Sequence, residues 1–223
     1  QCIIMETELW PNIINGCAIC NVPMVIANAR LSERSARGYQ RFAAITKPML
    51  QKISCVAVQT EIEKQRFTNL GLPTERIDVC GSIKFDISLT DKVTHQAAQW
   101  RDQWQLLNRP VWIAASTHKG EDEILLQAHQ VLLQKFDNAL LVIVPRHPER
   151  FESVYTLCHS AGLVTARRSS DEAVEGSCQV LLADTMGELM ALFGTAKVAF
   201  IGGSLVANGG HNMLEAAVWG LPI

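Results

Sequence analysis

The sequence predicts an α/β protein built from two domains, each with a parallel sheet covered by helices. Short, almost wholly apolar runs have the length and content of buried strands, and the segments between them carry a helical spacing of apolar residues. The same alternation starts again near residue 111, after a more polar stretch. With 223 residues the chain is long enough for two domains of ordinary size.

Residues 1–86 carry the first alternation of strands and helices. The expected strands are residues 2–5, 24–27, 55–58 and 77–80. The expected helices are residues 10–20, with Pro11 tolerated in the first turn, a helix from Ser32 to about residue 52, and residues 61–70, which Thr60 caps. Arginines on one side of the second helix leave an apolar face for the core, which comprises Phe42, Ile45, Met49 and Ile53.

Residues 87–110 are more polar, and we interpret them as an interdomain linker that contains one helix, residues 92–107. The second domain is then residues 111–223. Its expected strands are residues 111–115, 140–144, 163–166, 179–182 and 198–201, and its expected helices are residues 121–136, 149–161, 187–193 and 212–219. We expect a further strand to begin at residues 221–223, and we expect both domains to be incomplete in this chain.

Composition excludes several classes of function. The formal net charge is -2, without a basic stripe or clustered aromatic residues, which argues against nucleic-acid binding. The longest apolar run, residues 139–144, is far shorter than the roughly 20 residues of a membrane-spanning helix. The 7 cysteines are an odd number at irregular spacing, and Cys17 and Cys20 form a lone C-x-x-C, so we expect buried, reduced thiols.

The connection between the expected strand 198–201 and the last helix is the most informative stretch. It contains four glycines, at positions 202, 203, 209 and 210, which let backbone approach a ligand closely. A helix beginning at Asn212 would present free N–H groups to that loop, which suits a phosphate, and Glu215 could accept hydrogen bonds from a ribose. The alternative is a capping box, in which Glu215 folds back on Asn212 and binds nothing.

Two other strand-to-helix corners of the second domain carry candidate binding residues. Arg146 lies between Pro145 and Pro148, so its guanidinium is held at a strand end, where it suits bidentate contact with a phosphate. The alternative for this arginine is a surface salt bridge. In residues 184–188, Thr185 and Glu188 form a second possible capping box, so that glutamate also has two interpretations.

A metal site is not expected in the second domain. His118, His147 and His211 fall on separate corners without the spacing of metal ligands, and there is no D-x-D pair.

The first domain offers charged residues at strand ends. Glu6 and Glu8 follow the first strand, and we assign Glu8 to the dipole of the next helix and Glu6 to a cleft. Ser32 fits a helix N-cap. Lys84, at the junction of the two domains, is placed to meet an anionic substrate.

Six segments, in this order, resemble the bacterial 3-deoxy-D-manno-octulosonic acid (Kdo) transferases of lipid A synthesis. They are Met5-Glu-Thr-Glu-Leu-Trp-Pro-Asn12, Asn28-Ala-Arg-Leu-Ser32, Gly81-Ser-Ile-Lys-Phe-Asp86, Val144-Pro-Arg-His-Pro-Glu-Arg-Phe151, Asp184-Thr-Met-Gly-Glu-Leu189 and Gly202-Gly-Ser-Leu205. The resemblance covers essentially the whole chain. It implies the GT-B glycosyltransferase fold of two Rossmann-like domains, and inverting transfer of Kdo from CMP-Kdo to a lipid A precursor of the lipid IVA type. It places that reaction at the cytoplasmic face of the bacterial inner membrane, with no metal or cofactor.

The resemblance also assigns residues to roles. Glu6 and Lys84 would stabilise the transition state. The residues that would contact the CMP donor are Pro145, Arg146, Met186, Gly187, Glu188, Asn212, Met213, Leu214 and Glu215. Met213 departs from the proline common in the family. The family's general base, a glutamate, and its membrane-associating segment would both lie before Gln1, so we expect this chain alone to be inactive.

Two alternative functions remain open at this point. The chain could belong to another GT-B sugar-nucleotide enzyme, such as an epimerase, or serve as a non-catalytic nucleotide-sugar binding module. A preference for uridine over cytidine nucleotides would indicate the first alternative.

Overall fold

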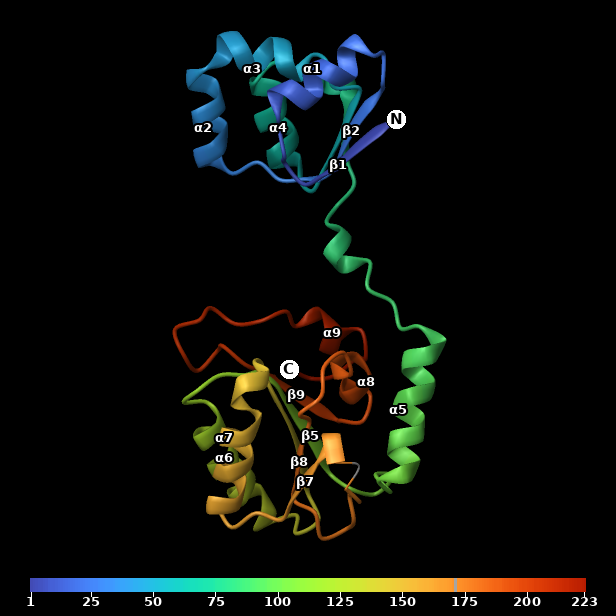
Figure 1. Ribbon diagram of the computed structural model, residues 1–223, viewed down its shortest axis with the longest axis vertical. Helices are drawn as coiled ribbons and strands as arrows, with labels where there is room; N and C mark the ends of the chain where they lie inside the picture. Colours follow the sequence, from blue (N-terminus) through green and yellow to red (C-terminus); the bar gives the residue numbers. More distant parts are fainter. Residues whose placement is uncertain (171) are drawn as a thin grey trace. The chain divides into compact units, whose positions relative to one another are not determined.

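The computed structural model describes residues 1–170 and 172–223, and it contains two compact units (Figure 1). They are Gln1–Asp86 and Ile87–Ile223, so the division falls where the sequence places the end of the first domain. Each unit has one sheet in which every pair of neighbouring strands is parallel. The predicted α/β class with two parallel-sheet domains is therefore confirmed.

The first unit has a sheet of order β1-β2-β3-β4. Its strands are β1 (Cys2–Met5), β2 (Met24–Ala29), β3 (Cys55–Val58) and β4 (Ile77–Val79). Its helices are α1 (Pro11–Ile19), α2 (Glu33–Arg41), α3 (Ala43–Leu50), α4 (Glu61–Asn69) and the short 3-10 turns η1 (Thr74–Arg76) and η2 (Ile83–Phe85). The hydroxyls of Ser32 and Thr60 accept backbone N–H bonds at the starts of α2 and α4, which confirms both predicted N-caps.

The predicted helix from Ser32 to about residue 52 is broken at Phe42. The backbone of Phe42 has φ -110° and ψ 35°, which ends α2 and starts α3 in a new direction. Met49 and Ile53 reach the core, whereas Phe42 and Ile45 are 68% and 65% exposed. The break explains why only the second half of the predicted apolar face is buried.

The second unit has a sheet of order β7-β8-β6-β5-β9. Its strands are β5 (Val111–Thr117), β6 (Leu140–Pro145), β7 (Thr165–Arg167), β8 (Val180–Leu182) and β9 (Val198–Ile201). Its helices are α5 (Asp91–Gln103), α6 (Asp122–Leu133), α7 (Phe151–Ser160), α8 (Leu189–Phe193), α9 (Leu214–Ala217) and the turns η3 (Pro148–Arg150) and η4 (Arg168–Ser170).

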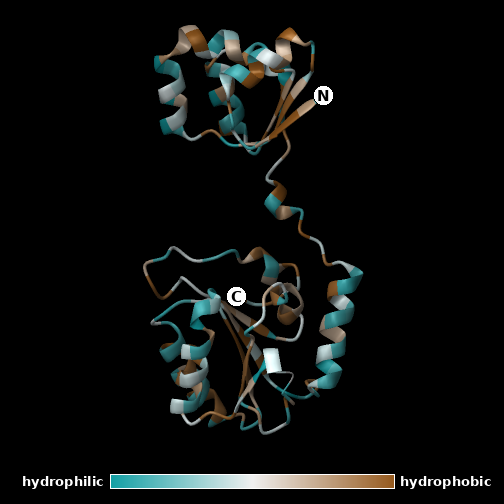
Figure 2. Cartoon of the chain, in the orientation of Figure 1, coloured by the Kyte–Doolittle hydropathy of each residue, from teal (hydrophilic) through white to brown (hydrophobic). Residues whose placement is uncertain are grey.

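Two apolar layers cover the faces of the second sheet. One combines strand residues such as Ile113 with residues of α5, α8 and α9, and the other combines strand residues such as Ile143 with residues of α6 and α7. The hydrophobic colour of the strands against the mixed colour of the helices shows this arrangement (Figure 2). Strands buried on both faces are near-continuous apolar runs, as the sequence predicts.

Helix α5 belongs to the second unit rather than to a free linker. Trp100 and Trp104 are only 6% and 5% exposed and belong to the apolar layer that α5 shares with α8 and α9. Their rings stack with centroids 5.3 Å apart. The burial of two indoles explains why most of the stretch 87–110, which we interpreted as a linker, is part of a packed domain.

All seven cysteines are free thiols, as expected, but only Cys158 and Cys178 are buried. Cys2, Cys17 and Cys55 are partly buried, and Cys20 and Cys80 are exposed. Within residues 1–170 and 172–223, no helix has both the length and the apolar content needed to cross a membrane.

Candidate functional site

The carboxyl ends of β5, β6, β8 and β9 meet at one edge of the second sheet, and the glycine loop after β9 lies against the corner after β5. A Cβ on Gly202 would stand 2.1 Å from the carbonyl oxygen of Ser116, so only glycine allows this approach. Gly203 has φ +79°, a conformation that favours glycine. Gly202 and Gly203 therefore allow the start of the glycine loop to pack against the corner after β5.

Glu121 anchors this contact. Its side chain is fully buried, and its carboxylate accepts hydrogen bonds from the backbone N–H groups of Gly203 (2.9 Å), Leu205 (3.1 Å) and His118 (2.9 Å). Burial opposes ionisation, but the three N–H donors outweigh it and lower the pKa of the carboxyl. A charged Glu121 therefore ties the glycine loop to the β5 corner.

A second buried carboxylate holds the corner that carries Arg146. Asp122 forms an ion pair with Arg150 and accepts a 2.6 Å hydrogen bond from the Thr117 hydroxyl. The Thr117 carbonyl in turn accepts bonds from Arg150 (2.6 Å) and from the Arg146 backbone N–H (3.1 Å). Burial raises the pKa of Asp122, and Thr117 and Arg150 offset part of that effect. The β6 corner is thus built on the β5 corner.

Arg146 itself is exposed at this edge. In the described part of the chain no carboxylate lies within ion-pair distance of its guanidinium. The alternative of a surface salt bridge therefore has no support, and the charge of Arg146 is available to an anion.

Three histidines that are far apart in the sequence converge beside Arg146. The Nε2 atoms of His118 and His211 are 2.5 Å apart, with stacked rings whose centroids lie 4.8 Å apart. The His147 ring meets the His118 ring edge-on at 5.7 Å. Two nitrogens bound to one tetrahedral zinc would stand about 3.3 Å apart, so the closer pair leaves no space for a metal between them. Over the residues the structure describes, no group of three or more His, Cys, Asp or Glu side chains is arranged to hold a metal.

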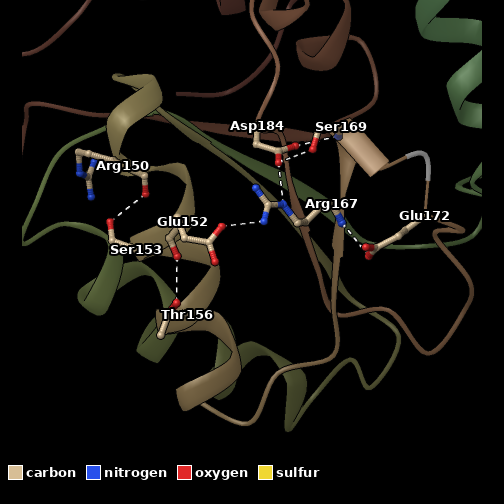
Figure 3. A network of polar contacts seen from close by, with 8 residues as sticks. All are labelled: Arg150, Glu152, Ser153, Thr156, Arg167, Ser169, Glu172 and Asp184. Carbon is tan, nitrogen blue, oxygen red and sulfur yellow. Dashed lines mark hydrogen bonds and ion pairs between the residues drawn. The ribbon is translucent and has the colours of Figure 1, made fainter.

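Hydrogen bonds from η4 and β7 hold the corner that follows β8. Asp184 accepts hydrogen bonds from the Ser169 hydroxyl (2.6 Å), the Ser169 N–H (2.8 Å) and the Arg167 guanidinium (2.8 Å), as Figure 3 shows. The pKa of Asp184 is lowered, because the hydrogen bonds from Ser169 and Arg167 outweigh the opposing effect of burial. Asp184 thus orients the segment that carries Met186, Gly187 and Glu188.

Glu188 is already engaged within the protein. Its carboxylate accepts a bond from the Thr185 hydroxyl and pairs with Arg168 at 3.0 Å. Helix α8 begins only at Leu189, and among the described residues no side chain caps its N-terminus, so the predicted capping box is not formed. Gly187 has φ +82°, and Met186 is 68% exposed. This corner therefore offers backbone and the Met186 side chain to a ligand, rather than a free carboxylate.

The last predicted helix, residues 212–219, is much shorter than expected. Helix α9 covers only Leu214–Ala217, so its dipole is small. The Asn212 side chain accepts a 3.1 Å bond from the Leu214 N–H, which leaves the predicted capping box with Glu215 unformed. Within the described residues the half-buried Glu215 carboxylate makes no hydrogen bond, and Met213 is 56% exposed. Positive charge for an anion therefore comes mainly from Arg146, with the imidazoles beside it as possible hydrogen-bond donors.

The first unit brings its two candidate residues to the same sheet edge. Glu6, with φ 61°, follows β1, and its N–H donates to the Ala27 carbonyl of β2 at 2.8 Å. The Asn28 side-chain oxygen accepts bonds from the Ile83 N–H (3.3 Å) and from Gln59 (2.8 Å). Lys84 is therefore held on this unit by the residue before it, and both Glu6 and Lys84 are exposed.

Glu8 does not complement the dipole of α1, because α1 has no acidic residue in its first turn. Its carboxylate instead accepts a 2.7 Å bond from the Trp10 indole.

Sequence reasoning missed the residues that position these candidates, namely Asn28, Glu121, Asp122 and Arg150. A usable signal was present at one place. Glu121 and Asp122 are adjacent acidic residues directly after a strand and a glycine, where three or four backbone N–H groups lack helical partners.

Comparison with known proteins agrees with these features. The family model described as 3-Deoxy-D-manno-octulosonic-acid transferase (kdotransferase) matches residues 1–87. A 3-deoxy-D-manno-octulosonic acid transferase from Haemophilus influenzae is 47% identical over 222 residues, which are 100% of this chain and 52% of the relative. The chain spans about half the length of the curated relatives it matches.

Two solved structures extend the comparison. The C-terminal CMP-Kdo binding domain of WaaA from Acinetobacter baumannii is 42% identical, with a TM-score of 0.57 over 60% of this chain and 69% of that chain. UDP-GlcNAc 2-epimerase from Methanocaldococcus jannaschii has a TM-score of 0.55 over 99% of this chain and 59% of that chain, but its 13% identity shows only a shared fold. On the matches to the Acinetobacter domain and the Haemophilus enzyme, this chain belongs to the Kdo transferase family.

Proposed function

We propose that the protein containing this chain transfers Kdo from CMP-Kdo to a lipid A precursor, with inversion at the anomeric carbon. The observation that carries this proposal is the assembled edge of the second unit. There Arg146, whose guanidinium has no ion pair among the described residues, lies near His211, which contacts His118, and the glycine loop is tied to the corner after β5. The chain that carries this edge is similar to a CMP-Kdo binding domain. The second unit would hold the donor nucleotide.

The donor residues divide by the kind of contact they offer. Arg146 supplies charge for the phosphate, with Pro145 fixing the backbone that carries it. The Glu215 carboxylate makes no hydrogen bond among the described residues, so its oxygens could accept from the ribose hydroxyls. The remaining contacts would come from backbone and exposed side chains at Met186, Gly187, Glu188, Asn212, Met213 and Leu214.

The proposed reaction is a displacement at the anomeric carbon. The acceptor hydroxyl oxygen attacks that carbon, the bond to the phosphate oxygen breaks, and CMP leaves with the electron pair. A glutamate base from the part of the protein outside this chain would take the acceptor proton. Lys84 would offset negative charge on the Kdo carboxylate or the departing phosphate, and Glu6 would face the cationic sugar. We also place the reaction at the cytoplasmic face of the inner membrane, because the proposed acceptor is a lipid.

The experiment measures CMP and UDP affinity by calorimetry in the complete protein and in Arg146→Ala. We expect CMP to bind more tightly than UDP, and the variant to lose about 1.5–3 kcal/mol of CMP binding, the range for a charge-assisted hydrogen bond. Arg34→Ala is the control, because Arg34 is an exposed arginine of the first unit without an ion pair in the described residues. Unchanged CMP affinity in folded Arg146→Ala would contradict the assignment.

A transfer assay separates the remaining possibilities. The complete protein is incubated with CMP-Kdo and a lipid A precursor, and the Kdo-bearing product is measured. Tight CMP binding without product would indicate a binding module, and preference for UDP would indicate a different sugar-nucleotide enzyme.

A further inference from the structure

The contact between His118 and His211 is unusual because it joins the Nε2 atom of one imidazole to the Nε2 atom of the other. With Nε2 atoms 2.5 Å apart, one nitrogen must donate a proton and the other must accept it. The contact is therefore compatible with a neutral pair or with a pair that carries one positive charge. It is not compatible with two imidazolium rings, since both Nε2 atoms would then be donors.

The surroundings of His211 favour the neutral pair when no anion is bound. The charged and titratable groups that face His211 are His118, Arg146, His147 and Glu121. Burial, His118 and Arg146 lower the pKa of His211, in that order. Glu121 acts in the opposite direction, but its carboxylate already accepts three backbone N–H bonds. The positive potential of Arg146 beside His211 is therefore only partly balanced by the charge of Glu121.

A phosphate beside Arg146 would reverse this balance. Its negative charge favours the charged form of any imidazole within a few ångströms. The shared Nε2 proton stays in place, and a second proton from solvent on a free Nδ1 gives the pair one positive charge and a charge-assisted hydrogen bond.

We propose that His118 and His211 are further ligands of the donor phosphate, and that phosphate binding draws one proton from solvent onto a free Nδ1 of this pair of imidazoles. This inference rests on the proposed donor site of the second unit. Its consequence is that affinity for a phosphate-bearing cytidine nucleotide increases as pH falls, by up to tenfold per pH unit, whereas affinity for cytidine stays constant. Because the two rings are coupled, the titration belongs to the pair.

The experiment measures proton uptake directly. The complete protein is titrated by calorimetry at about pH 7 with the methyl ester of CMP, a phosphodiester that does not itself titrate there. Two buffers of different ionisation enthalpy give the number of protons taken up per ligand. Cytidine is the probe that lacks the phosphate.

Variants assign the proton to the pair. His211→Gln and His118→Gln keep a side-chain amide near the Nε2 position but remove the titration. His95→Gln is the matched control, because His95 is exposed on α5. We expect uptake approaching one proton with the phosphodiester in the unchanged protein and in His95→Gln, and almost none in the other two variants or with cytidine.

Either of two calorimetric results would overturn the inference. One is phosphodiester binding without proton uptake in the unchanged protein, and the other is equal uptake in His211→Gln. The pH dependence of phosphodiester affinity in the unchanged protein, between about pH 5.5 and 8, provides a test that needs no variant, and a flat dependence would also overturn the inference. Failure of every cytidine nucleotide to bind would overturn the proposed function as well.

Discussion

Glu121→Gln tests whether one buried carboxylate holds the candidate donor site together. The substitution keeps the size of the side chain and removes its charge. One carboxylate oxygen, which accepts from His118 and shares the Gly203 N–H, becomes an NH2 group that faces backbone donors. The glycine loop should then detach from the corner after β5.

The magnitude follows from the bonds that are lost. Hydrogen bonds to a charged group contribute about 1.5–3 kcal/mol each, and leaving a buried donor unsatisfied costs about 1–3 kcal/mol. The amide is easier to bury than the carboxylate, which offsets part of this loss. We expect the free energy of unfolding to fall by about 3 kcal/mol, and CMP affinity to fall with it.

Urea unfolding and CMP calorimetry measure these two effects. The matched control is Glu123→Gln, which alters an exposed glutamate two positions later, in the first turn of α6, and should change stability by less than about 0.5 kcal/mol. If Glu121→Gln unfolded at the same urea concentration as Glu123→Gln, the anchoring role of Glu121 would be refuted. Lost stability with intact CMP affinity would show that the loop does not shape the nucleotide site.

Three further predictions concern single residues. Gly202→Ala places a Cβ 2.1 Å from the Ser116 carbonyl and should lower unfolding free energy by about 3 kcal/mol, whereas Gly16→Ala, with nothing within 4 Å, should raise it by about 0.5–1 kcal/mol. Equal effects in urea unfolding would contradict this. The ring nitrogens of His129 form hydrogen bonds with the Trp112 indole and the Gln179 carbonyl, and burial lowers the pKa of this histidine. As pH falls below about 6.5, the histidine therefore takes up a proton in the unfolded chain before it does so in the folded protein. Stability should then drop by up to about 1.4 kcal/mol per pH unit, and an identical slope in His129→Gln would exclude His129 as its source. Lys84→Ala should lower kcat of the complete enzyme more than it raises the donor KM, and the reverse result would make Lys84 a ground-state binding residue.

The sequence by itself determined the class of the fold and the position of most elements. Apolar runs such as residues 140–145 are stable as strands buried on both faces. In the segments between these runs, the apolar residues recur at the spacing of a helix rather than of a strand. Local chemistry also fixed the N-caps at Ser32 and Thr60, because a hydroxyl and an N–H three residues later are enough to form them.

Only the tertiary structure decided which side chains of the site meet. Glu121 and Gly203 are 82 positions apart, and His118 and His211 are 93 apart, so their contacts depend on the pairing of β5 with β9. Long-range packing also drew Trp100 and Trp104 into the core of the second unit. The short α9 and the break at Phe42 likewise appear only in the structure. Local sequence carries the preferences of short segments, whereas the free energy of burying distant groups together exists only once the sheet has formed.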